Sequence, residues 1–115
     1  MKQSEIWLID MDPAVGAEIK KIRPVVIIND DAVGILPLKI IVPLTDWKEH
    51  YALTVWMIKV DADKRNGLTK ISAADCFQIR SVSEDRFIKK LGAINQVQLT
   101  LIQDALASVL SIQGN

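Results

Sequence analysis

Residues 24–29, with the sequence PVVIIN, are the stretch that decides the fold. This run is continuous, apolar and rich in β-branched side chains, and it is short enough to be a buried strand and not a helix. A second dense apolar run, LKIIVPL at residues 38–44, predicts another strand. Pro43 has no backbone N–H to donate, so we expect it at a sheet edge or a strand end. The centre of the chain is therefore expected to be β-structure.

The predicted strands continue on both sides of these two runs. Residues 5–11 (EIWLIDM) are apolar and β-prone, and residues 12–22 then interrupt the pattern with proline, glycine and charges, which indicates a long, mobile loop. Residues 45–52 are polar and predict a loop, after which strand signal resumes at residues 53–60 (LTVWMIKV). Several short strands without intervening helices are typical of a compact antiparallel barrel.

The end of the β region carries a turn marker and an alternating segment. Asn66-Gly67 is a strong turn signal. Residues 75–82 partly alternate and predict a strand, and residues 83–91 predict a turn followed by a short strand. The alternating segment is expected to place Cys76, Gln78 and Arg80 on one face, and Phe77, Ile79 and Ser81 on the other.

Only the C-terminal segment has the pattern of a helix. Asn95 is a good N-cap, and Gln98 three residues later is placed to complete a capping box. Ile94 and Leu99 are placed to form a hydrophobic staple, and Gly114 to end the helix. The apolar stripe expected to face the core consists of Val97, Leu101, Ile102, Ala105, Leu106, Val109 and Leu110.

Composition indicates a folded, single-domain protein. The chain has 115 residues, half of them hydrophobic, and is long enough to bury a core as one domain spanning residues 1–115. Its 14 basic residues balance its 14 acidic residues, which argues against a protein that coats long nucleic acids. A local basic cluster of Lys20, Lys21 and Arg23 is still compatible with a small RNA site.

The cysteine count and the apolar segments indicate where the protein works. Cys76 is the only cysteine and has no internal disulfide partner, which is typical of a reducing compartment. The N-terminal segment MKQSEIWLID has no signal-peptide apolar run, and no stretch approaches the roughly 20 apolar residues of a membrane span. We therefore expect a cytoplasmic protein that does not enter a membrane.

Four motifs occur in order along the chain. They are EIWLIDMDPAVGAE at 5–18, KKIRPVVIIND at 20–30, IVPLTD at 41–46, and QIRSVSEDR at 78–86 followed by KKLG at 89–92. Each motif alone is weak, because Arg-Pro or Pro-Leu-Thr occurs often by chance. Together, at matching spacings over nearly the whole chain, they resemble the MazF/PemK toxin family.

The resemblance implies both a fold and an activity. The fold is mostly β with a C-terminal α-helix, an SH3-like antiparallel barrel of the CcdB/PemK type, usually in a homodimer. The activity is that of an endoribonuclease toxin, which cuts single-stranded RNA and is neutralised by a cognate antitoxin. The RNA's own 2′-hydroxyl is the nucleophile, the products carry a cyclic phosphate and a 5′-hydroxyl, and neither a metal nor a cofactor takes part.

The resemblance assigns the main catalytic roles to Arg23 and Thr45. This reaction builds negative charge on the phosphate oxygens, so fixed donors aimed at them supply the largest catalytic effect. The planar guanidinium of Arg23 matches phosphate geometry, and the following Pro24 biases Arg23 to an extended backbone. Thr45, at the end of a neighbouring strand, would add a neutral hydroxyl donor.

Further residues are candidates to support the reaction. Arginine titrates far above pH 7 and is a poor general base, so Glu18 in the loop is a candidate supporting base. Glu18 and Lys20 from the loop, with Gln78 and Arg80, are candidates to bind the substrate. For Arg80, a structural ion pair is an equal alternative.

Several aromatic and titratable side chains could have either a functional or a structural role. Trp47 is the aromatic expected to be exposed and able to stack on a base, whereas Trp56, inside an apolar run, is expected in the core. His50 is the only histidine and lacks the acid–base partner that a nuclease mechanism needs. Cys76 is expected to be a small buried hydrophobe.

Two positions depart from the family pattern. The family usually carries Asp or Glu immediately before Gln-Ile-Arg, where this chain has Phe77, and often a polar residue where it has Ala17. Phe77 accepts neither a proton nor a hydrogen bond, and the alternating pattern points it into the core. We expect an altered RNA sequence preference.

Two other functions fit the same fold. The related CcdB-type toxins poison DNA gyrase through a protein interface, without catalysis. A degenerate member that only binds its antitoxin is the second alternative, motivated by Phe77 and Ala17. The placement of Arg-Pro and Pro-Leu-Thr favours the nuclease.

Overall fold

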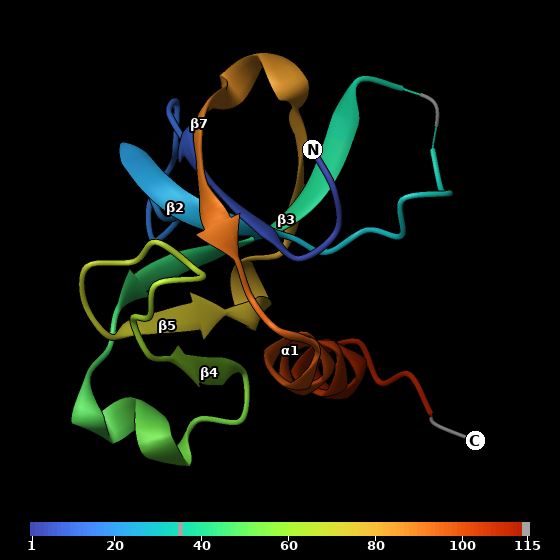
Figure 1. Ribbon diagram of the computed structural model, residues 1–115. Coiled ribbons are helices and arrows are strands. Elements are labelled where there is room, and N and C mark those ends of the chain that lie inside the picture. The colour runs from blue at the N-terminus through green and yellow to red at the C-terminus, as the bar shows by residue number, and fades with distance from the viewer. Residues whose placement is uncertain (35, 114–115) are drawn as a thin grey trace.

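The computed structural model describes residues 1–34 and 36–113, which form strands connected by short 3₁₀ turns and end in one α-helix (Figure 1). The strands are β1 (Glu5–Asp10), β2 (Ile22–Ile27), β3 (Leu38–Asp46), β4 (Met57–Val60), β5 (Ser72–Asp75), β6 (Arg80–Ser83) and β7 (Phe87–Ala93). The helix is α1 (Gln96–Val109), and the 3₁₀ turns are η1 (Glu49–Leu53), η2 (Cys76–Gln78) and η3 (Glu84–Arg86).

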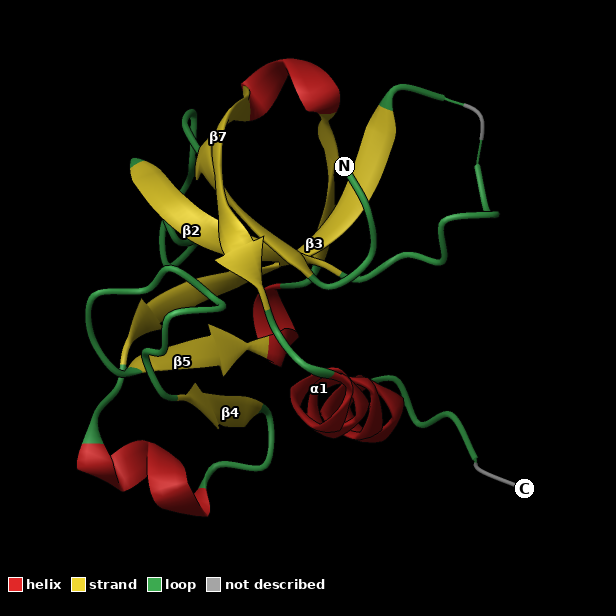
Figure 2. Cartoon of the chain, in the orientation of Figure 1, coloured by secondary structure: helices red, strands yellow, loops and turns green. Residues whose placement is uncertain are grey.

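The strands pair antiparallel in the order β4-β5-β3-β2-β1-β7, and β6 also pairs with β3. This confirms a mostly β fold with a C-terminal helix. Among the described residues the sheet does not close: β6 pairs with β3 and β7 with β1, while η3 joins β6 to β7 (Figure 2). The result is a strongly curved, open barrel.

Pro43 lies inside β3, so its expected position at an edge or strand end is wrong. On one side it is paired with Val25 of β2. On the other side β3 changes partner at this point, because Ile41 is the last residue paired with β6 and Leu44 the first paired with β5. The missing N–H is tolerated where one neighbouring strand ends and the next begins.

Two hydrophobic clusters lie on opposite faces of the curved sheet. Successive residues of a strand point to opposite faces, so Val25 and Val26 of the PVVIIN run belong to different clusters. The first cluster, beneath α1, contains Ile6, Val26, Val42, Leu44, Val60, Ala74, Cys76, Ile94, Leu99, Ile102, Ala105 and Leu106. The second cluster contains Ile9, Met11, Val25, Ile27, Ile41 and Val82.

The helix begins where the sequence predicts. Asn95 accepts from the backbone N–H of Gln98 at 2.8 Å, and the Gln98 side chain accepts from Asn95 in return, which completes the capping box. The buried stripe is narrower than expected, because α1 packs mainly against β4 and η2. Val97, Leu101 and Leu110 are exposed, while Leu99 is buried in addition to Ile102, Ala105 and Leu106. Gly114 lies outside the described residues.

Two predicted strands are shorter than expected. Instead of residues 53–60, β4 covers only Met57–Val60, because backbone turn bonds from Thr54 to Tyr51 and from Met57 to Thr54 occupy the preceding segment. Residues 75–82 are not one strand, because the Asp75 side chain accepts from the Phe77 backbone and starts η2. The predicted alternation of faces is therefore wrong, although Cys76 is buried as expected.

Two aromatic side chains lie on the surface and not in the core. Phe77 is 65% exposed and Trp56 is 38% exposed. Their ring centroids are 5.7 Å apart. Trp47, expected to be exposed, is half-buried beneath the Lys59 ammonium.

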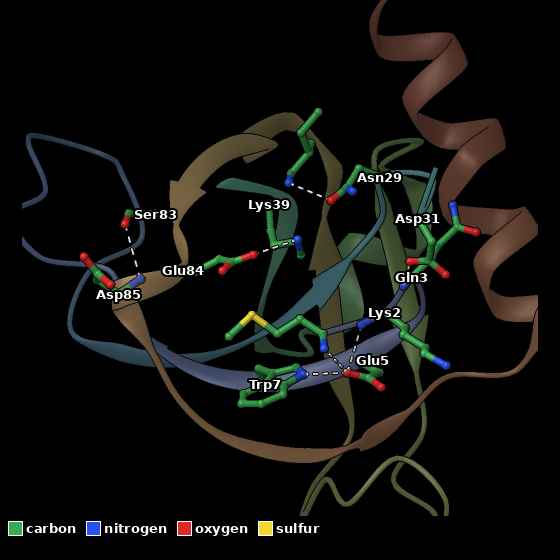
Figure 3. A network of polar contacts seen from close by, with 12 residues as sticks. Lys2, Gln3, Glu5, Trp7, Asn29, Asp31, Lys39, Ser83, Glu84 and Asp85 are labelled. Carbon is green, nitrogen blue, oxygen red and sulfur yellow. Dashed lines mark hydrogen bonds and ion pairs between the residues drawn. The ribbon is translucent and has the colours of Figure 1, made fainter. Parts of the chain in front are cut away.

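The carboxylate of Glu5 ties the N-terminal segment to β1 (Figure 3), and it also pairs with Lys90 of β7. It accepts from the Trp7 indole at 2.9 Å and the Lys2 backbone at 3.0 Å, and it pairs with Lys90 at 3.1 Å. Burial alone would raise the pKa of Glu5. The hydrogen bonds from Trp7, Lys2 and Lys90 outweigh burial and lower this pKa from 4.5 to about 2.

We expect Glu5→Gln to lower the free energy of unfolding at pH 7 by about 1–3 kcal/mol, because hydrogen bonds to a charged acceptor are the stronger kind. A folded-state pKa below the unfolded value stabilises the protein above pH 4.5, and this contribution is lost as the pH falls toward 2. Urea unfolding of both proteins across this range measures the difference. Glu49→Gln, at an exposed position of η1, is the matched control. A difference that does not change with pH would contradict this account.

Candidate functional site

Arg23 of β2 and Thr45 of β3 each lie two residues beyond the last Cα pair of the two strands. The register of β2 and β3 pairs Val25 with Pro43, and the same register continued by two residues places Arg23 opposite Thr45. Residues directly opposite on antiparallel strands point to the same side of the sheet. Both side chains are half-buried. The two motifs therefore supply a guanidinium and a hydroxyl to one place.

Arg80 projects from the same face. It is paired with Ile41 of β3, and side chains two and four residues apart on a strand share a face, so Arg80, Ile41 and Thr45 lie on one side of the sheet. The buried part of this face is the second hydrophobic cluster, which includes Ile41. The structural ion pair considered for Arg80 is not formed with any described residue. Its charge is available to a ligand.

A pocket of about 490 Å³ opens next to Arg80. Its apolar lining comes from the β1–β2 loop (residues 11–21) and from η2 and the residue that follows it, and its polar groups are Glu18, Gln78 and Arg80. The complete lining is Met11, Ala17, Glu18, Ile19, Phe77, Gln78, Ile79 and Arg80. A flat apolar wall with charged groups at its rim suits a nucleobase and its phosphate.

The β1–β2 loop is held at two places by side chains from far along the chain. Near its start, the Arg86 guanidinium donates to the backbone carbonyls of Asp10 at 3.0 Å and Asp12 at 2.5 Å. Near its middle, the Gln78 side chain accepts from the Ile19 backbone at 2.7 Å and donates to the Ala17 carbonyl at 3.4 Å. The loop is therefore docked over the pocket.

Glu18 and Lys20 are exposed on this loop. The Glu18 carboxylate accepts from the Val15 backbone at 2.6 Å, which turns the loop back on itself. The Lys20 carbonyl accepts from Nε of Arg23 at 3.3 Å. This contact uses only Nε of the guanidinium, so the two terminal NH₂ groups of Arg23 can still donate to a phosphate. The loop thus contacts Arg23 through the Lys20 backbone, and it places Glu18 in the lining of the pocket with Arg80.

Two carboxylates near the site have shifted pKa values. The Lys70 ammonium lies 2.7 Å from the Asp46 carboxylate, and its hydrogen bond lowers the pKa of Asp46, with a smaller contribution from the charge of Arg23. Burial raises the pKa of Asp75, which is only 6% exposed. Asp46 places a negative charge near Arg23 before any RNA is bound.

From the sequence alone, three residues that matter in this region were not assigned a role. Arg86 and Asp46 stand inside the quoted motifs, so the motifs contained a signal, but their roles depend on which carbonyl or ammonium group lies nearby. Asp75 has no signal in the pattern, because nothing in the alternation predicts the turn of η2.

His50 packs against the Tyr51 ring with centroids 4.6 Å apart and lies in η1.

Across residues 1–34 and 36–113, no three His, Cys, Asp or Glu side chains gather as a metal site requires. In the same part of the chain, no helix is long and apolar enough to cross a membrane.

Comparison with known proteins places these features in a family context. Residues 2–110 match the family of PemK-like, MazF-like toxins of type II toxin–antitoxin systems. Endoribonuclease MazF9 of Mycobacterium tuberculosis is 27% identical over 113 residues, which cover 92% of this chain and 92% of the relative. Endoribonuclease EndoA of Bacillus subtilis is 26% identical over 113 residues, which cover 97% and 96%. MazF from Deinococcus radiodurans (Form-I) has the same fold, with a TM-score of 0.79 at 18% identity over 97% of each chain.

The chemistry of Cys76 gives a test of this region. The thiol is fully buried at the start of η2, and burial, with a smaller contribution from the Asp75 charge, raises the pKa of Cys76 to about 12. Because the thiolate is the reactive form, we expect native Cys76 to resist iodoacetamide at pH 8 and to react readily in urea. Mass spectrometry of the alkylated chain measures both rates. Equal rates in the two conditions would show that η2 opens in the native protein.

Proposed function

The chain belongs to the PemK-like, MazF-like family of toxins of type II toxin–antitoxin systems, and from this premise we propose that it is an endoribonuclease that cuts single-stranded RNA. The observation that carries the proposal is the placement of Arg23 opposite Thr45, with Arg80 on the same face beside a pocket. The curated relatives that match most of this chain are themselves endoribonucleases by name.

The proposed reaction is an internal transesterification. The RNA 2′-hydroxyl oxygen forms a bond to phosphorus, the bond from phosphorus to the 5′-oxygen breaks, and the products are a 2′,3′-cyclic phosphate and a 5′-hydroxyl. The guanidinium of Arg23 and the hydroxyl of Thr45 donate to the phosphate oxygens as charge develops. Both are held by sheet strands, so little reorganisation is needed during the reaction.

Proton transfer is assigned to the loop side of the site. Glu18 is exposed and lies on the docked β1–β2 loop, so its carboxylate is the candidate to accept the 2′-hydroxyl proton. The proton needed by the leaving 5′-oxygen comes from solvent or from the guanidinium of Arg23. These steps balance without a metal ion, and we propose a metal-independent reaction.

Substrate binding is assigned to the pocket and its rim. Lys20 and Arg80 attract the phosphates that flank the cut bond. Gln78 lines the pocket and keeps the loop in place through its hydrogen bonds to Ala17 and Ile19. Phe77 presents a ring where the family usually has a carboxylate, and this ring is open to a base.

The proposed partners follow from the family. A cognate antitoxin would cover the RNA-binding surface and neutralise the enzyme, and the active form would be a homodimer. We place the protein in the cytoplasm, where its RNA substrates are found.

We expect Arg23→Ala to lower the rate of RNA cleavage by roughly 100-fold or more, because it removes the main donor to the transition state. Thr45→Ala removes a neutral donor and is expected to cost less, roughly 10-fold. The assay uses a long single-stranded RNA in excess EDTA, with the cut ends mapped and tested for cyclic phosphate. Circular dichroism checks that each variant is folded.

Arg65→Ala is the matched control, because Arg65 is an exposed arginine of the turn before β5 and lies outside the pocket. It is expected to retain wild-type activity. Undiminished cleavage by Arg23→Ala, or a requirement for a divalent ion, would contradict the proposed mechanism. Intact RNA together with inhibited DNA supercoiling would identify a gyrase poison instead.

Phe77 gives a separate prediction about sequence preference. Because its side chain is 65% exposed, Phe77→Glu is expected to fold normally and to restore the hydrogen-bond acceptor typical of the family. We expect the set of cleaved sequences to change while the maximal rate stays within about 10-fold. Sequencing the ends produced by both proteins from one long RNA measures this. Identical cleavage sites would show that Phe77 does not contact a base.

A further inference from the structure

We propose that Asp75 is a positioning residue that sets the orientation of the Gln78 amide and thereby seats the β1–β2 loop over the pocket. This inference rests on the proposed function, because the seated loop carries Glu18 and Lys20. Asp75 belongs to none of the four motifs, and it lies at the junction of β5 and η2.

The two carboxylate oxygens of Asp75 have separate tasks. Oδ1 accepts from the backbone N–H of Phe77 at 3.1 Å and caps η2. Oδ2 accepts from the side-chain Nε2 of Gln78 at 3.1 Å. Asp75 is 6% exposed, so these hydrogen bonds form largely out of water, where leaving them unmade is costly. The first bond is local, and the second reaches toward the loop.

The second bond determines which way the Gln78 amide points. Oδ2 of Asp75 accepts from the Gln78 amide, so the amide turns its NH₂ group toward Asp75. The amide oxygen then faces the loop, where it accepts from the Ile19 backbone at 2.7 Å, and the NH₂ group also reaches the Ala17 carbonyl at 3.4 Å. If the amide were flipped, its NH₂ group would face the backbone N–H of Ile19, and its oxygen would face the Asp75 carboxylate and the Ala17 carbonyl. None of these pairs can form a hydrogen bond.

The position of the loop matters because its functional groups lie next to this contact. Glu18 stands between the two loop residues that Gln78 holds, and the Lys20 carbonyl accepts from Arg23. Arg86 holds only the start of the loop, at Asp10 and Asp12. The Asp75–Gln78 pair is therefore what fixes the middle of the loop, where the candidate base and a phosphate-binding lysine lie.

Asp75→Asn separates the two tasks of this side chain. The amide oxygen introduced at position 75 still accepts from Phe77 and caps η2, but the amide NH₂ now meets the NH₂ of Gln78. We expect the loop to loosen. Trypsin is expected to cut after Lys20 or Lys21 at least about 10-fold faster, and the Ile19 amide to exchange with solvent faster by a similar factor. Trypsin does not readily cut the Arg23–Pro24 bond, so the cleavage products report on Lys20 and Lys21.

The RNA assay completes the test. A loosened loop is expected to raise KM for RNA by roughly 10-fold and also to lower kcat, because the loop carries Lys20 and the candidate base Glu18, while the Arg23–Thr45 pair is held by the sheet. The double variant D75N/Q78E restores matching groups, since a carboxylate at position 78 accepts from both the new amide and the Ile19 backbone. It is expected to recover loop protection, measured by trypsin cleavage and Ile19 exchange, which a merely structural role for Asp75 does not predict.

Asp63→Asn is the matched control, because the Asp63 carboxylate accepts only from its own turn, at Arg65 and Asn66. It is expected to leave trypsin cleavage and KM unchanged. If D75N does not fold, Gln78→Met removes the same loop contacts from a half-buried position of similar size.

Unchanged trypsin cleavage and unchanged Ile19 exchange in the folded variant would overturn the proposal, whatever the enzyme does to RNA. A loosened loop with unchanged KM and kcat would also overturn it. If the wild-type protein cuts no RNA, the proposed function fails, while the two loop measurements still decide whether Asp75 seats the loop.

Discussion

The structure depends on one long strand that changes partners halfway along. β3 pairs with β6 in its first half and with β5 in its second, and the change occurs at Pro43, which has no N–H to place between them. Because a single strand belongs to both parts of the sheet, its alternating side chains enter both hydrophobic clusters. The same strand pairs with β2 throughout the change, and this common pairing aligns Thr45 with Arg23. The strand that contributes to both hydrophobic clusters therefore also carries a residue of the candidate site.

The candidate site combines rigid and adjustable parts. The proposed phosphate donors Arg23, Thr45 and Arg80 come from strands whose backbones are hydrogen-bonded on the sheet. Glu18 and Lys20 come from a loop whose ends are joined by a backbone hydrogen bond from Met11 to Lys21, and whose attachment to the rest of the protein comes mainly from the side chains of Gln78 and Arg86. A few side-chain hydrogen bonds are weaker than a strand ladder, so the loop is the part able to open for a long, flexible substrate. This division suits an enzyme whose chemistry needs fixed donors but whose substrate must thread past them.

Phe77 shows how a small local change alters a conserved scaffold. The motif leads one to expect a carboxylate at this position. Here Glu18 lines the same pocket from the β1–β2 loop, and Asp75 is turned inward to cap η2 and to hold Gln78. Its burial raises its pKa, in contrast to an exposed acid that would meet a base. The exposed surface instead carries the Phe77 and Trp56 rings. The proposed recognition of a base at this place would therefore use a ring face and Arg80, and less a hydrogen bond to an acid.

The sequence by itself determined the elements whose signals are local. The β-branched run at 24–29, the turn at Asn66-Gly67 and the capping box at Asn95 appear where they were predicted, because propensity and short-range hydrogen bonds act within a few residues. The order of the four motifs also pointed to Arg23 and Thr45. Only the tertiary structure decided that Phe77 faces outward, that Pro43 lies inside a strand, and that Asp75 meets Gln78. Each of these depends on a partner distant in sequence or on a side-chain bond that replaces strand pairing, and such choices are settled by packing and not by local pattern.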